Sequence, residues 1–125
     1  MNRDNHSDPE DALDNLQRIL DCSSALRRYM DHFGPYEEEF AGNEMYRDCC
    51  FSKIDQMILC IDRLSELYPE IHDDHFVEVS IEGIRLLSVR AYEHTDPSPV
   101  WDFLVNDLPV IEDAARDAIK KLPIS

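Results

Sequence analysis

Apolar residues recur at helical intervals through the first quarter of the chain. They would lie on one face of a helix and comprise Leu13, Leu16, Leu20, Leu26, Met30 and Phe33. Ser7 opens a sequence typical of a capping box at a helix start, and Gly34, followed by a proline, is typical of a helix end. The pattern predicts a first helix over residues 8–33, preceded by a disordered polar tail at residues 1–6.

A second apolar stripe lies between Asn43, which can cap a helix, and Pro69, which cannot continue one. Its members are spaced three or four positions apart: Cys50, Ile54, Met57, Ile61, Leu64 and Tyr68. We therefore predict a long second helix between Asn43 and Pro69. Residues 34–43 would form a connector that contains one short turn at residues 37–40.

Residues 75–93 carry a mixed pattern. Val77, Val79 and Ile81 alternate with polar residues, and a period of two is typical of a β-strand. The rest of the chain offers no second strand for pairing, and an unpaired strand is unstable. The sequence therefore favours a third long helix over residues 75–93, in which Gly83 would cost about 1 kcal/mol relative to alanine.

Two further helices are predicted after residue 94. Pro97 and Pro99 interrupt the third helix, and Ser98 is positioned to cap a short helix over residues 100–106. The Asp-Leu-Pro sequence at residues 107–109 predicts another turn. A final amphipathic stripe consists of Ile111, Ala114, Ala115, Ala118, Ile119 and Leu122. The expected fold class is all-α, an up-and-down four-helix bundle with one additional short helix.

Length and composition limit the number of domains, the cellular location and the state of the cysteines. The 125 residues suffice for one domain, expected here over residues 7–125. No apolar run approaches the roughly 18 residues of a membrane span, and the N-terminal residues lack a signal-peptide stretch, so we expect a soluble, cytoplasmic protein without membrane contact. Four cysteines, two of them adjacent at Cys49 and Cys50, are poor material for a disulfide framework and fit a reducing compartment.

The net charge is strongly negative. With 12 basic and 27 acidic residues, the formal charge is −15. Such a surface repels a phosphate backbone, so the charge disfavours RNA binding except at a local cationic pocket or through a partner. The acidity is typical of a solubility device or of a surface that binds a basic protein.

The candidate chemistry is concentrated in residues 83–109. Arg85 and Arg90 stand five positions apart in a weakly polar run, which a plain core helix does not require. In a helix they would point about 140° apart, with Tyr92 almost opposite Arg90. Farther along come the only tryptophan and an Asp-Leu-Pro sequence: Trp101, Asp107, Leu108 and Pro109.

This ordered set resembles the signature of the HEPN superfamily, and specifically of its HepT-like toxins. That signature is Arg, Asn, three residues, His, one residue and Tyr, followed by a Trp and an Asp-Leu-Pro sequence. The likeness extends from about residue 45 onward. Two signature positions differ here, because Leu86 stands in place of the asparagine and Arg90 in place of the histidine. The family also usually carries an Ile-Gly-Glu sequence upstream, in its second helix. The equivalent positions here are Cys60, Ile61 and Asp62, so that pattern is only partly kept.

The resemblance implies a toxin–antitoxin component that cleaves RNA without metal or cofactor, as a homodimer in which two copies of the motif meet in a cleft. In that mechanism the arginine binds the scissile phosphate and the histidine transfers protons. Arg85 can take the first role. Arg90 cannot take the second, because a guanidinium stays protonated at any relevant pH. Tyr92 matches the tyrosine to which a nucleotidyltransferase antitoxin adds AMP.

His94 is the nearest replacement for the missing proton carrier. It would lie on the same helix face as Arg90 but about 6 Å farther along the axis, and loss of a general acid or base commonly costs roughly 10²–10⁴-fold. The sequence therefore predicts a HepT-like component with an impaired site that acts through dimerisation and partner binding. The alternatives are an active ribonuclease that uses Arg85, Arg90 and His94, and a helical adaptor unrelated to nucleic acid.

Simpler interpretations stand beside these roles. Arg85 and Arg90 can pair with acidic neighbours, Tyr92 can pack at a helix end, and Trp101 can be a structural plug for the short helix. Residues 72–75, His-Asp-Asp-His, offer metal-ligand types but no second ligand set at recognisable spacing, so no metal site is predicted.

Overall fold

The chain forms an all-α bundle, as its apolar pattern predicts. The computed structural model describes residues 9–67 and 97–122, and these residues form helices with no strand among them. The elements are α1 (Pro9–Phe33), α2 (Glu37–Ala41), α3 (Glu44–Leu67), α5 (Ser98–Asp102), a π-helical turn (Phe103–Asp107) and α6 (Leu108–Lys121). The predicted first, second and final helices and the short turn in the connector are confirmed. The helix predicted over residues 75–93 lies outside the described residues.

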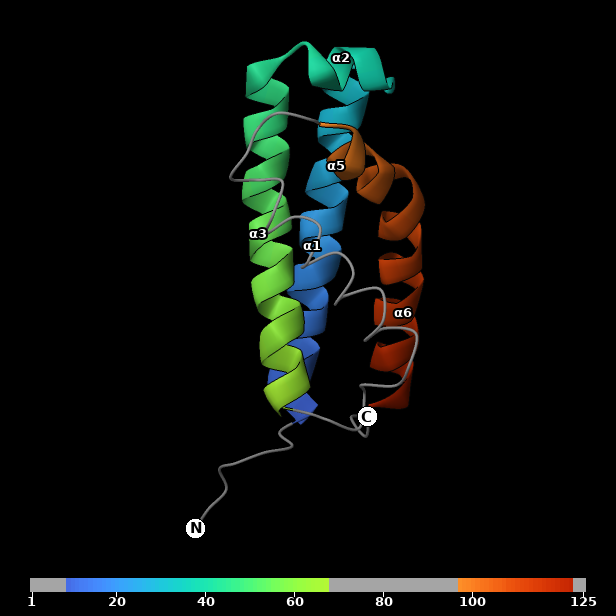
Figure 1. The fold of residues 1–125 in the computed structure, drawn as a ribbon. Helices are drawn as coiled ribbons and strands as arrows, with labels where there is room; N and C mark the ends of the chain where they lie inside the picture. The colour runs from blue at the N-terminus through green and yellow to red at the C-terminus, as the bar shows by residue number, and fades with distance from the viewer. Residues whose placement is uncertain (1–8, 68–96, 123–125) are drawn as a thin grey trace.

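Three long helices lie side by side along one axis (Figure 1). α1 packs against both α3 and α6. α3 and α6 run opposite to α1, so the end of the bundle where α1 begins is also the end where the other two finish. The short α2 and α5 lie together at the other end, where α2 also contacts α3. The described helices therefore have up-and-down topology, as expected for antiparallel neighbours joined by a short connection.

The predicted apolar stripes supply most of the core. The stripe of α3 is buried at Cys50, Ile54, Met57, Ile61 and Leu64. α6 contributes Leu108, Ile111, Ala115 and Ala118, and α1 contributes Ala12, Leu16, Ile19, Cys22 and Leu26. In α1, four residues of the predicted stripe are only partly buried at the margin of this core: Leu13, Leu20, Met30 and Phe33. The buried face of α1 differs from its most apolar face because α1 must contact two helices on different sides.

Local hydrogen bonds hold the connection between α1 and α3. Gly34 ends α1 at a φ of 130°, a conformation that favours glycine, and its N–H donates to the Met30 carbonyl oxygen at 3.0 Å. The Tyr46 hydroxyl donates to the Gly34 carbonyl oxygen at 2.8 Å. Asn43 caps α3, because its Oδ1 accepts a hydrogen bond from the Tyr46 N–H at 3.1 Å. The predicted helix end at Gly34 and the predicted cap at Asn43 are confirmed.

Replacing Asn43 with alanine should lower the free energy of unfolding by about 1 kcal/mol, because the Tyr46 N–H would lose its partner at the start of α3. Asn43→Asp keeps a short acceptor and should retain most of the stability. Urea denaturation followed by far-ultraviolet circular dichroism measures both variants. An unchanged midpoint for Asn43→Ala would show that the cap contributes nothing.

The short helix begins differently from the prediction. Ser98 is predicted as its N-cap, but α5 starts at Ser98 itself and follows Pro97, with no capping hydrogen bond from a side chain. The Ser98 hydroxyl instead donates to Glu37 Oε2 of α2 at 2.6 Å. The Ser98 hydroxyl, which by local preference would cap the helix, therefore binds a residue far away in the sequence instead.

A continuous helical path replaces the turn predicted at residues 107–109. Phe103–Asp107 form a π-helical turn, in which the Leu108 N–H donates to the Phe103 carbonyl oxygen, and α6 follows directly. A proline inside an ordinary α-helix clashes with the carbonyl group four residues before it. The wider π turn gives Pro109 the space that it needs at the start of α6. The turn prediction is therefore wrong.

All four cysteines carry free thiols. Cys50 is fully buried and Cys49 is partly exposed, as expected for adjacent helix positions that point about 100° apart. Among the described helices, none combines the length and the apolar character needed to cross a membrane.

Candidate functional site

Four candidate site residues lie outside the described residues: Arg85, Arg90, Tyr92 and His94. Their roles stay predictions, and residues 72–75 also lie outside the described residues. The structure does describe the C-terminal part of the signature, from Trp101 to Pro109. It also contains two polar features that the sequence did not predict, a partly buried ion pair between α1 and α6 and a cation-lined groove between α1 and α3.

Trp101 lies in a cluster of aromatic side chains. Its ring centroid is 5.4 Å from that of Phe40 in α2 and 6.4 Å from that of Tyr46 in α3. Phe33, at the end of α1, stacks on Tyr46 with a centroid distance of 5.0 Å. Only 8% of Trp101 is exposed. The tryptophan thus joins α5 to α2 and α3, which confirms its interpretation as a structural plug.

The Asp-Leu-Pro sequence at residues 107–109 also has a structural role. Leu108 is fully buried in the core, whereas Asp107 and Pro109 are partly exposed. The three residues form the junction between the π-helical turn and α6. Asp107, Leu108 and Pro109 therefore anchor the last helix to the bundle.

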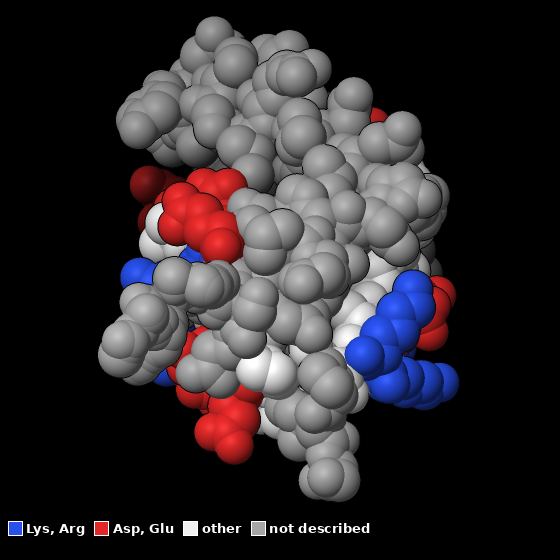
Figure 2. Space-filling model, turned by 90° about the horizontal axis from the view of Figure 1, so that it is seen from below, with Lys and Arg blue, Asp and Glu red and all other residues white. Residues whose placement is uncertain are grey.

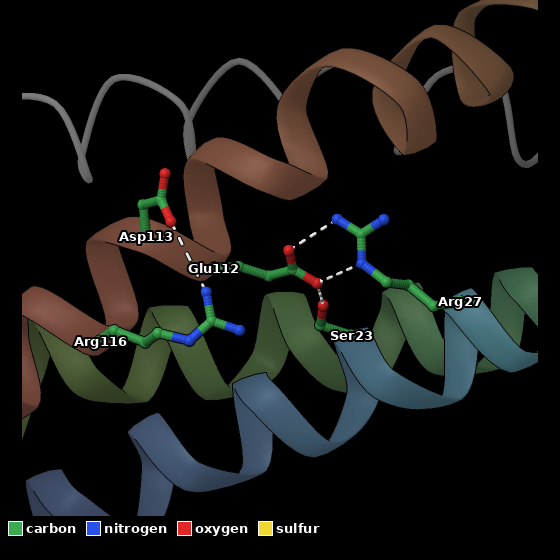
Figure 3. Close-up of polar contacts among 5 residues, drawn as sticks. All are labelled: Ser23, Arg27, Glu112, Asp113 and Arg116. Carbon is green, nitrogen blue, oxygen red and sulfur yellow. Dashed lines mark hydrogen bonds and ion pairs between the residues drawn. The ribbon is translucent and has the colours of Figure 1, made fainter.

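A buried carboxylate connects α6 to α1 (Figure 3). Glu112 points from α6 toward α1 and accepts hydrogen bonds from Arg27 Nε at 2.8 Å and Arg27 Nη2 at 2.6 Å. The Ser23 hydroxyl, one helical turn before Arg27, donates to Oε2 of the same carboxylate. Because Ser23 and Glu112 are both buried, these contacts supply the partners that their polar atoms need inside the protein.

Electrostatics keep Glu112 ionised. Burial alone would raise the pKa of Glu112, but the hydrogen bonds from Arg27 and Ser23 and the charge of Arg27 outweigh burial and lower the pKa from 4.5. The hydrogen bond to Glu112 raises the pKa of Arg27 in turn. A carboxylate with a lowered pKa and engaged oxygens is a poor proton acceptor. The Ser23–Arg27–Glu112 cluster is therefore a structural link between two helices.

The sequence does hold a signal for this cluster. Glu112 interrupts the apolar stripe of the last helix between Ile111 and Ala115, and a charged residue on a buried stripe requires a partner. Ser23 and Arg27 are four residues apart and so share a helix face. The pattern alone cannot choose Arg27 among the basic residues, because that choice depends on how α6 packs against α1.

An open groove of about 800 Å³ lies between α1 and α3. Basic side chains from both helices line it, Arg18 and Arg28 from α1 and Lys53 and Arg63 from α3. Figure 2, which looks at the end of the bundle where α6 finishes, shows basic side chains reaching the surface there beside acidic ones. The surface of this acidic chain is thus locally mixed, and the groove is a place where cations gather.

The described residues contain no metal centre, because no group of three or more His, Cys, Asp or Glu side chains among them is placed to hold an ion. No protein-family model matches the chain, and a search of solved structures finds no match. Function is therefore inferred from the residues themselves.

Proposed function

We propose that this protein is a HepT-like HEPN component of a toxin–antitoxin-type system, with a ribonuclease-derived but catalytically impaired site, and that it acts through dimerisation and partner binding. The observation that carries the proposal is the ordered signature in which Arg90 occupies the position of the catalytic histidine. The all-α bundle supports it, since that is the fold that the resemblance implies.

The packing of the described signature residues also supports the proposal. Trp101 is held against Phe40 and Tyr46, and Leu108 is fully buried. The chain from Pro97 onward is thereby part of the well-packed bundle. A firm scaffold of this kind is what a precisely positioned phosphate-binding site requires.

The chemistry of the two arginines explains the loss of catalysis. A guanidinium binds a phosphate through a fork of N–H donors, so Arg85 and Arg90 can both hold an anion. Neither can accept a proton near neutral pH, and in-line cleavage of RNA by its own 2′-hydroxyl needs a group that does. Leu86, in place of asparagine, removes a further polar group from the proposed cleft. Binding without cleavage is the expected behaviour.

The proposal is tested by restoring the signature. We expect the natural protein to leave single-stranded and structured RNA intact in the presence of a metal chelator. The double variant Leu86→Asn with Arg90→His should gain cleavage, by a factor within the roughly 10²–10⁴ that a general acid or base contributes. Adding Arg85→Ala to that variant should abolish the gain. Arg116→His is the matched control, because it places a histidine on the exposed surface of α6.

Each outcome decides between the candidate functions. Cleavage by the natural protein that disappears in Arg85→Ala would contradict an impaired site and favour the active ribonuclease. Light scattering should give twice the chain mass of 14.6 kDa. A monomer that gains no cleavage in the restored variant would overturn the proposal and favour a helical adaptor.

Tyr92 at the signature tyrosine favours one second candidate, an active metal-independent endoribonuclease toxin that a nucleotidyltransferase antitoxin silences by adding AMP to Tyr92. Incubation with such an enzyme and ATP would then add the mass of AMP to the natural protein but not to Tyr92→Phe. An unmodified Tyr92 together with absent cleavage would remove this candidate.

A further inference from the structure

The groove between α1 and α3 concentrates cations in an otherwise acidic chain. Among the described residues, its lining includes four basic side chains, Arg18, Arg28, Lys53 and Arg63, and three acidic ones, Asp21, Asp62 and Glu66. Basic residues thus outnumber acidic ones in the described lining, although acidic residues outnumber basic ones 27 to 12 in the chain. The groove is therefore a place where the repulsion of an anion by this protein is locally reduced.

The four cations form two pairs. Arg18 and Arg28 are ten residues apart on α1, which places them about 15 Å apart along the helix axis. Lys53 and Arg63 have the same spacing on α3. Because the two helices are antiparallel, Arg18 lies at the same end of the groove as Arg63, and these two also share a smaller hollow bordered by Asp11 and Asp14.

Arg28 and Lys53 form the pair at the other end, by the same antiparallel alignment. Cations from two different helices therefore flank the groove at both ends, with about 15 Å between the pairs.

Among the described residues, the paired cations contact no acceptor. In the part of the chain that the structure describes, no hydrogen bond or ion pair involves Arg18, Arg28, Lys53 or Arg63. By contrast, Arg27, Arg47 and Arg116 each contact an acceptor of the protein. No described residue therefore competes with an anion in the groove for their N–H donors.

Between the cation pairs the groove is lined mainly by small and apolar residues, together with the polar Asp21 and Gln56. Cys22 and Ala25 are buried in its floor, and Cys60 and the exposed Leu59 line the opposite helix. Burial raises the pKa of the Cys22 thiol, with a further contribution from neighbouring Cys60, and burial raises the pKa of Cys60 as well. Both thiols therefore stay neutral near pH 7, and the floor suits an apolar chain.

We propose that this groove binds a small elongated molecule that carries a phosphate group at each end and an apolar segment between them. Arginine forks match phosphate oxygens. The groove volume of about 800 Å³ falls within the roughly 300–1,000 Å³ of small-molecule sites. Both ends must be occupied together, because each isolated cation pair is open to water and binds a phosphate weakly. This site is independent of the proposed function, since it uses none of residues 85–94.

Calorimetric titration with the bisphosphate of decanediol tests the proposal, because its extended chain separates the two phosphates by about the distance between the cation pairs. Decyl monophosphate and the bisphosphate of ethylene glycol are the comparison probes. The first has one phosphate, and the second cannot reach both ends. We expect the decanediol probe to bind at least about tenfold more tightly than either, because attachment of one end raises the effective concentration of the other.

Charge variants locate the site. Arg18→Gln with Arg63→Gln, and separately Arg28→Gln with Lys53→Gln, should each reduce the affinity for the decanediol probe about tenfold, to the level of the monophosphate. Arg116→Gln with Lys120→Gln removes the same charge from α6 and should leave the affinity within about twofold. Glutamine is a good helix former, so circular dichroism should show all three proteins folded.

The proposal fails if the decanediol probe binds no more tightly than the short bisphosphate to the natural protein, a comparison that needs no variant. It also fails if the α6 control loses as much affinity as the groove variants, since the effect would then be one of net charge.

Discussion

Replacing Trp101 with alanine is expected to lower the free energy of unfolding by about 3–5 kcal/mol, the range for large aromatic residues removed from a core. The indole is 8% exposed and contacts the rings of Phe40 and Tyr46, so its removal leaves a cavity where α5 meets α2 and α3. Trp101→Phe retains part of the ring contact and should lose less. Far-ultraviolet circular dichroism in urea is the measurement, because the variant has no tryptophan left to report fluorescence.

A matched truncation at the surface provides the control. Met45 is 65% exposed at the start of α3, and Met45→Ala should change the free energy of unfolding by less than about 0.5 kcal/mol. Equal losses for Trp101→Ala and Met45→Ala would contradict the burial of the indole.

Replacing Glu112 with alanine is expected to lower the free energy of unfolding by about 2 kcal/mol. Breaking a fully buried ion pair commonly costs about 3–5 kcal/mol, but the Arg27 side chain is 47% exposed, and water can solvate its charge once the partner is gone. The Ser23 hydroxyl, which is buried, would lose its acceptor. Asp113→Asn is the control on the next residue, since the Asp113–Arg116 pair spans 3.6 Å on the surface and should be worth less than about 0.5 kcal/mol.

The contribution of Glu112 to the free energy of unfolding should depend on pH. Because the pKa of Glu112 is lower in the folded protein than in the unfolded chain, the ion pair contributes its full stability above the unfolded pKa, near 4.5. That contribution is lost as the pH falls through the lower folded pKa. The difference in free energy of unfolding between the natural protein and Glu112→Gln should therefore be constant near neutral pH and shrink below about pH 4.5. A difference that stays constant down to pH 3 would show that Glu112 carries no lowered pKa.

The aromatic cluster around Trp101 and the ion pair between Glu112 and Arg27 lie at different places in the bundle. Trp101 joins the helix ends around α2, whereas Glu112 joins α6 to α1. The two sites share no partner, so the losses in the double variant Trp101→Ala with Glu112→Ala should add.

Local sequence information was enough to predict the long helices that the structure describes. The stripe from Cys50 to Leu64, the glycine at position 34 and the cap at Asn43 depend on neighbours within a few residues, and all appear as expected. The same local rules failed at Ser98 and at residues 107–109. At Ser98 a distant acceptor, Glu37, engages the hydroxyl, and at Pro109 a π-helical turn accommodates a residue that ordinarily ends a helix.

The sequence by itself determined the helical character of the described residues and the positions of most of their helix ends. Whether residues 85–94 form a cleft stays a prediction. Only the tertiary structure decided that Glu112 meets Ser23 and Arg27, and that four cations spaced ten residues apart on two helices flank one groove. The physical reason is that periodicity along a helix arises from contacts between near neighbours, whereas a contact between helices depends on their relative alignment, which the packing of the whole core sets.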